Sequence, residues 1–368
     1  MNIIHVLSSF GLGGQERVAL DLAVGQKADG HRPIAITLEP GDPGPVGQEF
    51  RDAGVEVRHL PKRPGFDVRL AFQLGDLFRR EHADVVHTHN PQPLIYSGVG
   101  ARLNRAALVH TKHGMNPDTS RRVRLRQAAA KLVDAFVAVS EPTAEHARET
   151  GECAPSKLHT IPNGIDLSRF GGTDDAEARA AVRKELGISP DSWVVGTVGR
   201  LWPEKGHPYM LRSLEPLLGP SFHVLIAGDG PDAKEMAEFV ANLRVPESVH
   251  LLGPRLDIPR VLAALDTFVL SSVREGLPLV IPEAMAAGLP VVSTAVGGIP
   301  GVVEEGRTGF LVEYNDEEGM RDRIAALDAD RKMAKECGIR GRTAALERYS
   351  SQRMVRDYMD LYEEIRRR

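Results

Sequence analysis

Short apolar runs alternate with helix-like segments over most of the chain. The first run, 3–7, is rich in β-branched residues, and apolar residues recur at helical spacing in the next segment, 15–29. The pattern continues with strands expected at 34–38, 55–59, 84–88, 108–112, 135–140 and 157–161 and helices at 68–78, 94–103, 122–133 and 142–149. Alternation of strand and helix predicts a parallel sheet with helices on both faces.

The pattern breaks at 162–175, which is loop-like, and a short charged helix is expected at 176–186. Alternation then restarts, with strands expected at 193–198, 223–227, 248–252, 267–271, 290–294 and 310–312. We therefore predict an α/β protein with two doubly wound, Rossmann-like domains, 1–165 and 166–350. The final helix, 351–368, is expected to pack back on the first domain. Ligands of such sheets bind beyond the carboxyl ends of the strands, so the domains are expected to face a central cleft.

Composition narrows the class of protein. Hydrophobic residues make up 42% of the chain and charged residues 26%, a composition too apolar for a disordered chain. The net charge of −4 argues against a nucleic-acid partner. Cys153 and Cys337 are too few for a disulfide framework and match no metal spacing. No apolar run approaches the ~20 residues of a membrane-spanning helix, and the first residues do not resemble a signal peptide. We expect a cytoplasmic protein that at most binds the cytoplasmic membrane surface.

A loop after the first strand of the second domain carries two cations. Arg200 and Lys205 stand five positions apart in a segment shaped by Gly199, Pro203 and Gly206. A guanidinium fork and an ammonium group can converge on a diphosphate, although both could simply be solvated charges. A tight turn at Gly228 after the next strand could also approach a ligand, but such turns are common.

The strongest motif is a pair of glutamates eight positions apart, Glu275 and Glu283, which follows the strand expected at 267–271. A helix is expected to begin at about Pro278, so that the amides of Gly276, Leu277, Pro278 and Leu279 would surround a helix N-terminus suited to a diphosphate. (Pro278 itself contributes no N–H.) Glu283 would lie about one turn into this helix, where its carboxylate could accept hydrogen bonds from ribose hydroxyls. The alternative is a plain surface residue.

The first domain offers a glycine-rich turn and several histidines. Gly13 and Gly14 precede Glu16 at the start of the first helix, where glycine lets a ligand approach the backbone. The turn partly matches a dinucleotide fingerprint, but Glu16 occupies the place of its third small residue. His113 follows the strand expected at 108–112 and is placed at the edge of the cleft.

No metal site is predicted. His87 and His89 end the strand expected at 84–88, but we expect their side chains to point to opposite faces, and no third ligand is obvious. The pair Asp328 and Asp330 lies in a polar stretch that reads as solvated. The cations and amides of the second domain would then neutralise a bound diphosphate, and no cofactor is expected.

Together these motifs resemble the retaining family 4 glycosyltransferases, which have the GT-B fold, over nearly the whole chain. The matching segments are Gly13-Gly14-x-Glu16, His113-Gly114, Ile161-Pro162-Asn163-Gly164-Ile165-Asp166, Val198-Gly199-Arg200-Leu201, Lys205-Gly206, Ala227-Gly228-Asp229-Gly230-Pro231 and Glu275 to Glu283 with the Ala284-Met285-Ala286 that follows. The resemblance implies transfer of a sugar from a nucleoside-diphosphate sugar to an acceptor, with retained anomeric configuration and without metal.

The resemblance also implies roles for individual residues. His113, Glu275, Arg200 and Lys205 would form the catalytic set. The donor would be bound by Gly13, Gly14, Arg200, Lys205, Gly228, Arg255, Glu275, Gly276, Leu277, Pro278, Leu279 and Glu283, with Arg255 near the nucleobase. Glu16, His89 and His113 would lie on the acceptor side.

Three other functions remain open at this stage. They are a sugar-nucleotide epimerase or phosphorylase of the same fold, a nicotinamide-dependent oxidoreductase, and a binding module without activity. The identity of the donor and of the acceptor is also open.

A basic segment suggests where the acceptor is met. Arg121, Arg122, Arg124 and Arg126 fall in the helix expected at 122–133 and just before it, which could lie on an anionic membrane. The alternative is an ordinary charged face above an apolar core stripe. A membrane contact would suit a lipid-linked or glycan-precursor acceptor.

Overall fold

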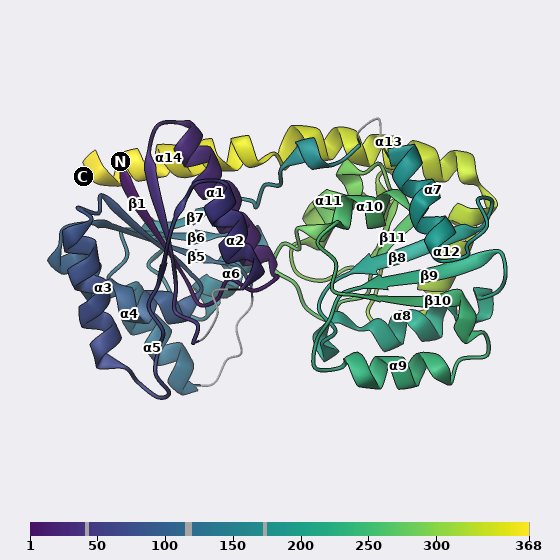
Figure 1. The fold of residues 1–368 in the computed structure, drawn as a ribbon, viewed down its shortest axis with the longest axis horizontal. Coiled ribbons are helices and arrows are strands. Elements are labelled where there is room, and N and C mark those ends of the chain that lie inside the picture. The colour runs from purple at the N-terminus through teal and green to yellow at the C-terminus, as the bar shows by residue number, and fades with distance from the viewer. Residues whose placement is uncertain (41–43, 115–119, 172–174, 368) are drawn as a thin grey trace. The chain divides into compact units, whose positions relative to one another are not determined.

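A computed structural model describes residues 1–40, 44–114, 120–171 and 175–367, without the side chains of residues 120 and 121. Within them the chain forms two compact units (Figure 1). Unit 1 comprises Met1–Asp166 and the chain from Ser350 onward, and unit 2 comprises Leu167–Tyr349.

Unit 1 contains a parallel sheet of seven strands in the order β3-β2-β1-β4-β5-β6-β7. The strands are β1 (Asn2–Leu7), β2 (Arg32–Thr37), β3 (Glu56–His59), β4 (Val85–His89), β5 (Ala107–Lys112), β6 (Ala135–Ala138) and β7 (Leu158–Thr160). The register places Ile4 of β1 beside Ile34 of β2 and Val86 of β4. The chain therefore winds outward in both directions from β1, as expected for a doubly wound domain.

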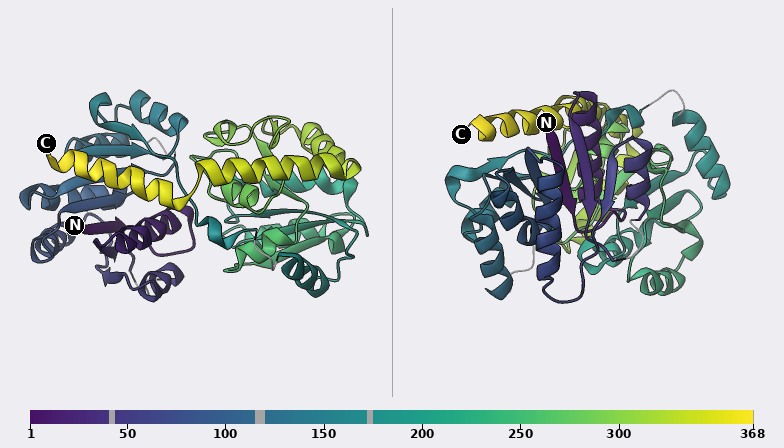
Figure 2. Two further views of the ribbon diagram at one scale, coloured as in Figure 1. Left: turned by 90° about the horizontal axis from the view of Figure 1, so that it is seen from above. Right: turned by 60° about the vertical axis from the view of Figure 1, so that its left-hand side comes forward.

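Helices cover both faces of this sheet (Figure 2). They are α1 (Gly14–Ala28), α2 (Pro45–Asp52), α3 (Val68–Arg80), α4 (Pro91–Leu103), α5 (Ser120–Ala130), α6 (Glu141–Glu149) and α14 (Ser351–Arg367). Alternate residues of β1 pack on opposite sides, Ile4 and Val6 against the α3 and α4 face and Leu7 against α1 and α2. The last helix, α14, packs against α1.

Unit 2 contains a parallel sheet of six strands in the order β10-β9-β8-β11-β12-β13. These are β8 (Trp193–Val198), β9 (Phe222–Ala227), β10 (Val249–Gly253), β11 (Thr267–Leu270), β12 (Val291–Thr294) and β13 (Gly309–Val312). Its helices are α7 (Asp175–Glu185), α8 (His207–Leu214), α9 (Ala233–Ala241), α10 (Ile258–Ala263), α11 (Val280–Ala286), α12 (Glu317–Ala329) and α13 (Arg331–Arg348). A core between the sheet and helices α8, α9 and α12 includes Val195, Met210 and Ile324.

The predicted fold class is confirmed, and every strand in the described residues lies within two positions of its expected bounds. Three helices of unit 1 differ. α2 was not expected, α4 begins at Pro91 instead of residue 94, and α5 occupies 120–130 instead of 122–133. Proline fits the first turn of α4, where an N–H has no helical partner. None of the described helices is both long and apolar enough to cross a bilayer.

Candidate active site

Two strand-end loops of unit 2 bring predicted site residues into contact. Lys205, after β8, donates a hydrogen bond from Nζ to Oε1 of Glu275, after β11, over 2.6 Å. Ser272 donates to the same oxygen over 2.7 Å. The Lys205 side chain is 25% exposed and the Glu275 side chain 11%, so the pair is mostly shielded from water. This contact holds the cationic loop and the glutamate loop together at one edge of the sheet.

Arg200 is placed differently from Lys205. Its side chain is exposed, and its guanidinium lies 5.2 Å from the ring centroid of Trp202, close enough for a cation–π contact. Among the described residues it forms no ion pair with a carboxylate. Arg200 therefore offers a cation that an anionic ligand could bind without displacing an internal partner.

Gly228 allows the loop after β9 to lie against the cationic loop. Its φ of +152° is disfavoured for other residues, and a Cβ there would come 1.8 Å from the carbonyl oxygen of Gly199. Leu201 also donates its amide to the carbonyl of Asp229 over 3.0 Å. Gly228 thus has a structural reason for its place, and its predicted contact with the donor stays a prediction.

The glutamate motif has the expected burial but a shifted helix start. Helix α11 begins at Val280, two residues later than predicted, and Gly276, Leu277, Pro278 and Leu279 form the buried connection that precedes it. Glu283 lies in the first turn and is half-buried, between the buried Pro282 and Ala284. The environment of Glu283 is that of a helix residue set against the core, not of a fully solvated one.

A glycine that was not predicted as a site residue supports the glutamate loop. Gly297, after β12, has a φ of +55°, and a Cβ there would lie 1.9 Å from the carbonyl oxygen of Glu275. Next to it, Gly298 donates its amide to the carbonyl of Gly276 over 2.8 Å. The Gly297-Gly298 pair after a predicted strand was the available signal, because adjacent glycines at a strand end often mark close backbone approach.

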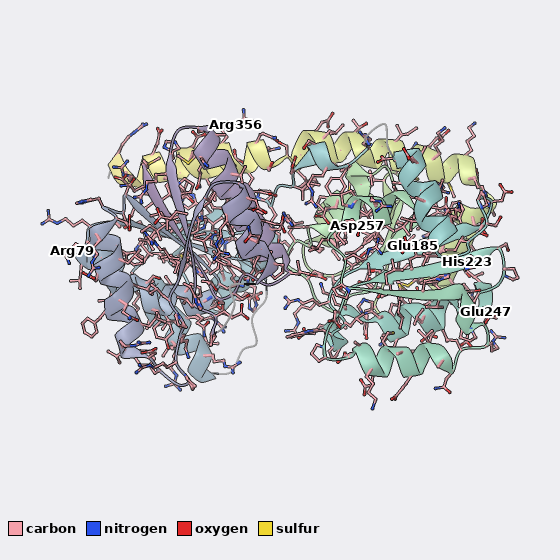
Figure 3. The ribbon with its side chains drawn as sticks, in the orientation of Figure 1. Arg79, Glu185, His223, Glu247, Asp257 and Arg356 are labelled. Atoms are coloured by element: carbon pink, nitrogen blue, oxygen red, sulfur yellow. The ribbon has the colours of Figure 1, made fainter. Side chains whose placement is uncertain are left out.

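Arg255, the predicted nucleobase contact, is held within its own unit. Its Nε and Nη2 donate to the two carboxylate oxygens of Asp257, each over 2.7 Å, and Nη1 lies 3.7 Å from Glu185. Figure 3 labels Asp257 and Glu185. The guanidinium lowers the pKa of the Asp257 carboxyl, mainly through these hydrogen bonds. The nucleobase role of Arg255 stays a prediction.

In unit 1, Gly13 and Glu16 contact one another at the start of α1. The buried carboxylate of Glu16 accepts hydrogen bonds from Ser9 Oγ over 3.0 Å and from Gln15 Nε2 over 2.6 Å. A Cβ on Gly13 would lie 2.4 Å from Oε2 of Glu16. Gly14 is the first residue of α1. Roles for these residues toward a ligand stay predictions.

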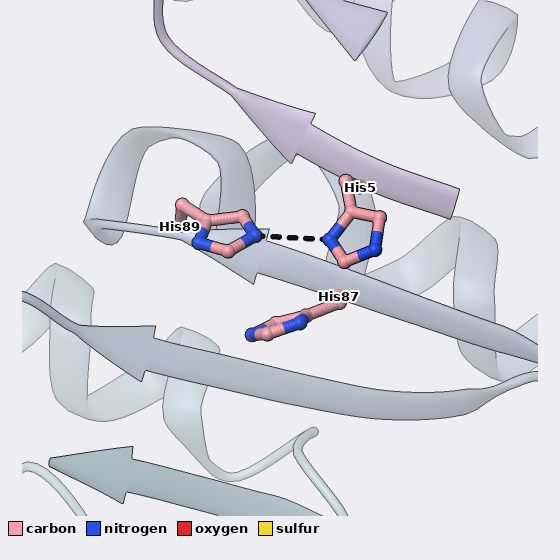
Figure 4. Close-up of side chains that lie close together, drawn as sticks. All are labelled: His5, His87 and His89. Carbon is pink, nitrogen blue, oxygen red and sulfur yellow. Dashed lines mark hydrogen bonds between the residues drawn. The ribbon is translucent and has the colours of Figure 1, made fainter. Parts of the chain in front are cut away.

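Three histidines of unit 1 form a buried cluster that was not predicted. We expected His87 and His89 to point to opposite faces, which was wrong: residues two apart in a strand share a face, and their ring centroids are 4.2 Å apart. His5 of β1, which was not singled out, joins them on the same face (Figure 4). The available signal was that His5 is a polar residue inside the otherwise apolar predicted strand 3–7.

Hydrogen bonds connect this cluster to His113. Nδ1 of His5 and Nε2 of His89 are 3.1 Å apart, and Nδ1 of His89 and Nε2 of His113 are 3.0 Å apart. At the other end, Nε2 of His5 bonds to Oε1 of Gln26 over 2.8 Å. Gln26 lies in α1 and was not among the predicted site residues.

Burial keeps these imidazoles uncharged at neutral pH. It lowers the pKa of His5 to about 4 and that of His113 to about 3, and it holds the pKa of His87 and His89 well below the ordinary value. No carboxylate is hydrogen-bonded to any of these four rings among the described residues. An uncharged imidazole has an acceptor nitrogen, so neighbouring rings can hydrogen-bond to one another, whereas two charged rings offer only donors.

His5, His87 and His89 are also the described residues whose ligand atoms lie close enough together to hold a metal ion, within 4.8 Å of one another. Each of their ring nitrogens already has a hydrogen-bond partner. His87 bonds to Thr111 Oγ1 over 2.7 Å and to Tyr362 of α14 over 2.6 Å. The arrangement fits a hydrogen-bonded network better than a metal centre, and the absence of a metal stays a prediction.

One of the predicted membrane cations is not available to a membrane. Arg126 is buried, and its Nε donates to Oε1 of Glu152 over 2.8 Å, next to Lys112, whose Nζ lies 2.9 Å from the same oxygen. The membrane assignment of Arg126 was therefore wrong, because the carboxylate that binds it comes from the connection after α6, 26 residues along the chain. Arg122 and Arg124 are exposed, and the side chain of Arg121 lies outside the described residues.

Comparison with known proteins places this geometry in a family. The family described as Glycosyl transferases group 1 matches residues 178–344, and Glycosyltransferase Family 4 matches residues 12–169. The UDP-Gal:alpha-D-GlcNAc-diphosphoundecaprenol alpha-1,3-galactosyltransferase of Escherichia coli is 31% identical over 288 residues, 74% of each chain. The N-acetyl-alpha-D-glucosaminyl L-malate synthase of Bacillus anthracis is 27% identical over 86% of this chain and 84% of the relative.

Solved structures agree with the fold. The structure of Anabaena Alr3699/HepE in complex with UDP-glucose has a TM-score of 0.87 at 22% identity, covering 99% of this chain and 100% of that one. Sucrose-phosphate synthase from Thermosynechococcus elongatus has a TM-score of 0.83 at 20% identity, covering 99% of each chain. The two parallel-sheet domains of this chain are therefore those of the GT-B fold.

The buried histidines predict how stability depends on pH. Because their folded pKa values lie below the unfolded value of about 6.5, the unfolded chain binds more protons below that pH. Their stabilising contribution is thus complete above pH 6.5 and is lost as pH falls toward the folded values. In urea unfolding between pH 7 and 5, His5→Phe should reduce the slope of unfolding free energy against pH by up to about 1.4 kcal/mol per unit.

Phe78→Leu is the matched control, since it changes a buried aromatic residue of the same unit without removing a titratable group. Its slope should equal that of the wild type. An unchanged slope in His5→Phe would mean that His5 does not stay neutral in the folded protein.

Proposed function

The chain belongs to the family 4 glycosyltransferases, and we propose that it transfers a hexose from a uridine-diphosphate sugar to an acceptor hydroxyl, with retained anomeric configuration and without a metal ion or cofactor. The observation that carries the donor side of this proposal is the contact of the Arg200–Lys205 loop with the Glu275 loop at the strand ends of unit 2. None of the relatives named above supports an oxidoreductase, an epimerase, a phosphorylase or an inactive binding module.

The reaction needs charge stabilisation on the leaving group. The bond between the anomeric carbon and the diphosphate breaks with its electron pair going to the diphosphate. The acceptor hydroxyl attacks the same face of a short-lived, oxocarbenium-like sugar and gives its proton to the departing diphosphate oxygen. Arg200 and Lys205 would stabilise the departing diphosphate as preorganised cations. Glu275 would lie beside the sugar, and Glu283 would accept hydrogen bonds from the ribose.

The Lys205–Glu275 pair has a consequence for this role. The Glu275 carboxylate holds the Lys205 ammonium group in place before the donor binds. Donor binding therefore does not have to pay the entropy of ordering this flexible side chain. Arg200 lies against the Trp202 ring and forms no ion pair within the part of the chain that the structure describes, so it supplies the charge that is not already balanced. We therefore assign Arg200 the larger share of diphosphate neutralisation and Lys205 the more exact placement.

We propose uridine diphosphate as the nucleotide of the donor because of what two similar proteins are named for. The Escherichia coli relative is named for UDP-Gal, and the HepE structure holds UDP-glucose. The acceptor is less constrained, because one relative is named for a diphosphoundecaprenol-linked sugar and another for L-malate. A glycolipid or polysaccharide precursor is our proposal for the acceptor, and its linkage is left open.

Exposed side chains on three helices of unit 1 favour a lipid-linked acceptor. Helix α4 packs against both α3 and α5, so the three lie side by side (Figure 1). Their outer surface exposes large apolar side chains together with cations of α5. The apolar ones include Phe72 at 75% and Leu103 at 79% exposure, and the cations are Arg122 and Arg124. Exposed apolar side chains and arginines on three packed helices suit the interface of an anionic membrane, so we propose peripheral attachment of a cytoplasmic enzyme there.

Donor binding should depend on the two cations and not on metal. By calorimetry with UDP in excess chelator, Arg200→Ala and Lys205→Ala should each weaken binding by about 1.5–3 kcal/mol, roughly ten- to hundredfold, because a charge-assisted contact to phosphate is lost. Lys234→Ala removes an exposed lysine of the same unit and should leave the affinity unchanged. Equal affinity in all four proteins would remove the diphosphate assignment, and binding that needs added magnesium would remove metal independence.

The membrane proposal predicts salt-dependent sedimentation with anionic vesicles. Each cation near the surface contributes about 1 kcal/mol, so changing Arg122 and Arg124 to Gln should reduce vesicle binding roughly tenfold or more at low salt. Changing Phe72 and Leu103 to Ser should weaken binding at high salt as well, since apolar insertion is not screened. Arg340→Gln, a cation of unit 2, is the control. A wild type that ignores anionic vesicles would redirect the search to soluble acceptors.

A further inference from the structure

The row of hydrogen bonds that ends at His113 lies entirely within unit 1. It runs from the Gln26 side chain of α1 through His5 of β1 and His89 of β4 to His113, which follows β5. Gln26, His5 and His89 are fully buried. Solvent therefore does not reach the middle of the row. The groups at its two ends determine which ring nitrogens carry a proton.

The direction of the row follows from the chemistry of its members. An uncharged imidazole has one N–H donor and one acceptor nitrogen. The donor-to-acceptor direction of one hydrogen bond in the row therefore fixes the direction of the next. Oε1 of Gln26 can only accept, which makes Nε2 of His5 the donor and its Nδ1 the acceptor. His89 then donates from Nε2 and accepts at Nδ1, and His113 donates from Nε2.

The far end of the row is an unused acceptor. With its proton on Nε2, His113 keeps a lone pair on Nδ1, and this atom is covered and has no hydrogen-bond partner among the described residues. A buried polar atom without a partner is unfavourable until a ligand supplies one. A hydroxyl group of a ligand is the simplest hydrogen-bond donor to the lone pair on Nδ1.

We propose that Gln26, His5 and His89 are positioning residues that hold the His113 ring as one tautomer, with Nε2 protonated and Nδ1 ready to accept a hydrogen bond from a substrate hydroxyl. The proposal rests on the proposed function for the identity of that hydroxyl, which belongs to the sugar being transferred or to the acceptor. Burial supports it by keeping the three imidazoles uncharged near neutral pH.

The neighbouring His87 is outside the row and provides the control. It is fully buried, lies on the same strand as His89 and contacts its ring, but its nitrogens bond to Thr111 and Tyr362. A change at His87 disturbs the same core without interrupting the connection from Gln26 to His113.

Nitrogen-15 NMR of the full chain, labelled at histidine, tests the tautomer directly, because a protonated and an unprotonated ring nitrogen have distinct shifts. His113→Gln assigns the His113 signals. We expect an unprotonated Nδ1 and a protonated Nε2 in the wild type and in His87→Phe. Gln26→Met and His5→Phe, which interrupt the row, should give a mixture of the two tautomers. A protonated Nδ1 in the wild type, or a His87→Phe spectrum that changes as much as that of His5→Phe, would overturn the proposal.

A nucleotide-release assay with UDP-glucose and UDP-galactose separates this proposal from the proposed function. Gln26→Met and His5→Phe should lower kcat/KM on the order of fivefold to tenfold, the effect of one lost hydrogen bond, while His87→Phe should not. Failure of the wild type to bind or hydrolyse any sugar nucleotide would reject the proposed function but leave the tautomer measurement standing. Release that is equal in all variants would reject the positioning role.

Discussion

Parallel strand direction is the constraint on which the candidate site depends. In a parallel sheet all carboxyl ends lie at one edge, so loops that are far apart in the sequence come together there. In unit 2 the loops after β8, β9 and β11 meet in this way, although Lys205 and Glu275 are 70 residues apart. In unit 1 the same direction sets His89 at the end of β4 beside His113 just after β5.

Close backbone approach then converts neighbouring loops into a defined geometry. Gly228 and Gly297 stand where a Cβ would overlap a carbonyl oxygen of the adjoining loop. Once the loops are this close, side-chain contacts such as Ser271 Oγ to the Lys205 carbonyl, 2.9 Å, fix their position. Electrostatic catalysis needs such preorganisation, since charges that must first be arranged stabilise a transition state less.

Much of the fold could be predicted from the sequence because the central strands of both sheets are buried on two faces and read as nearly unbroken apolar runs. The runs at β1 and β8, for example, stand out from their more polar surroundings. Helix α2 was missed because it has only eight residues, with Val46 and Phe50 as its large buried side chains. Two apolar positions in so short a segment are too few to establish a helical period.

Contacts between elements were harder to predict than the elements themselves. The Arg200, Lys205, Glu275 and Glu283 motifs could be located because they follow strands. The burial of Arg126, by contrast, depends on Glu152, which lies in the loop after α6. The histidine cluster needed the registers of β1 and β4, which bring His5 beside His87. Hydrogen bonds with Gln26 and with Tyr362 of α14 complete that cluster, and no local sequence pattern indicates them.

The anomeric configuration of released sugar tests the proposed chemistry most directly. Proton NMR can follow the first glucose released from UDP-α-glucose by the enzyme in excess chelator, before the free sugar equilibrates. Attack on the face that the diphosphate leaves, assisted by Arg200 and Lys205 without a metal ion, predicts that α-glucose appears first. Initial release of β-glucose, or release that occurs only when a divalent metal is restored, would contradict the mechanism.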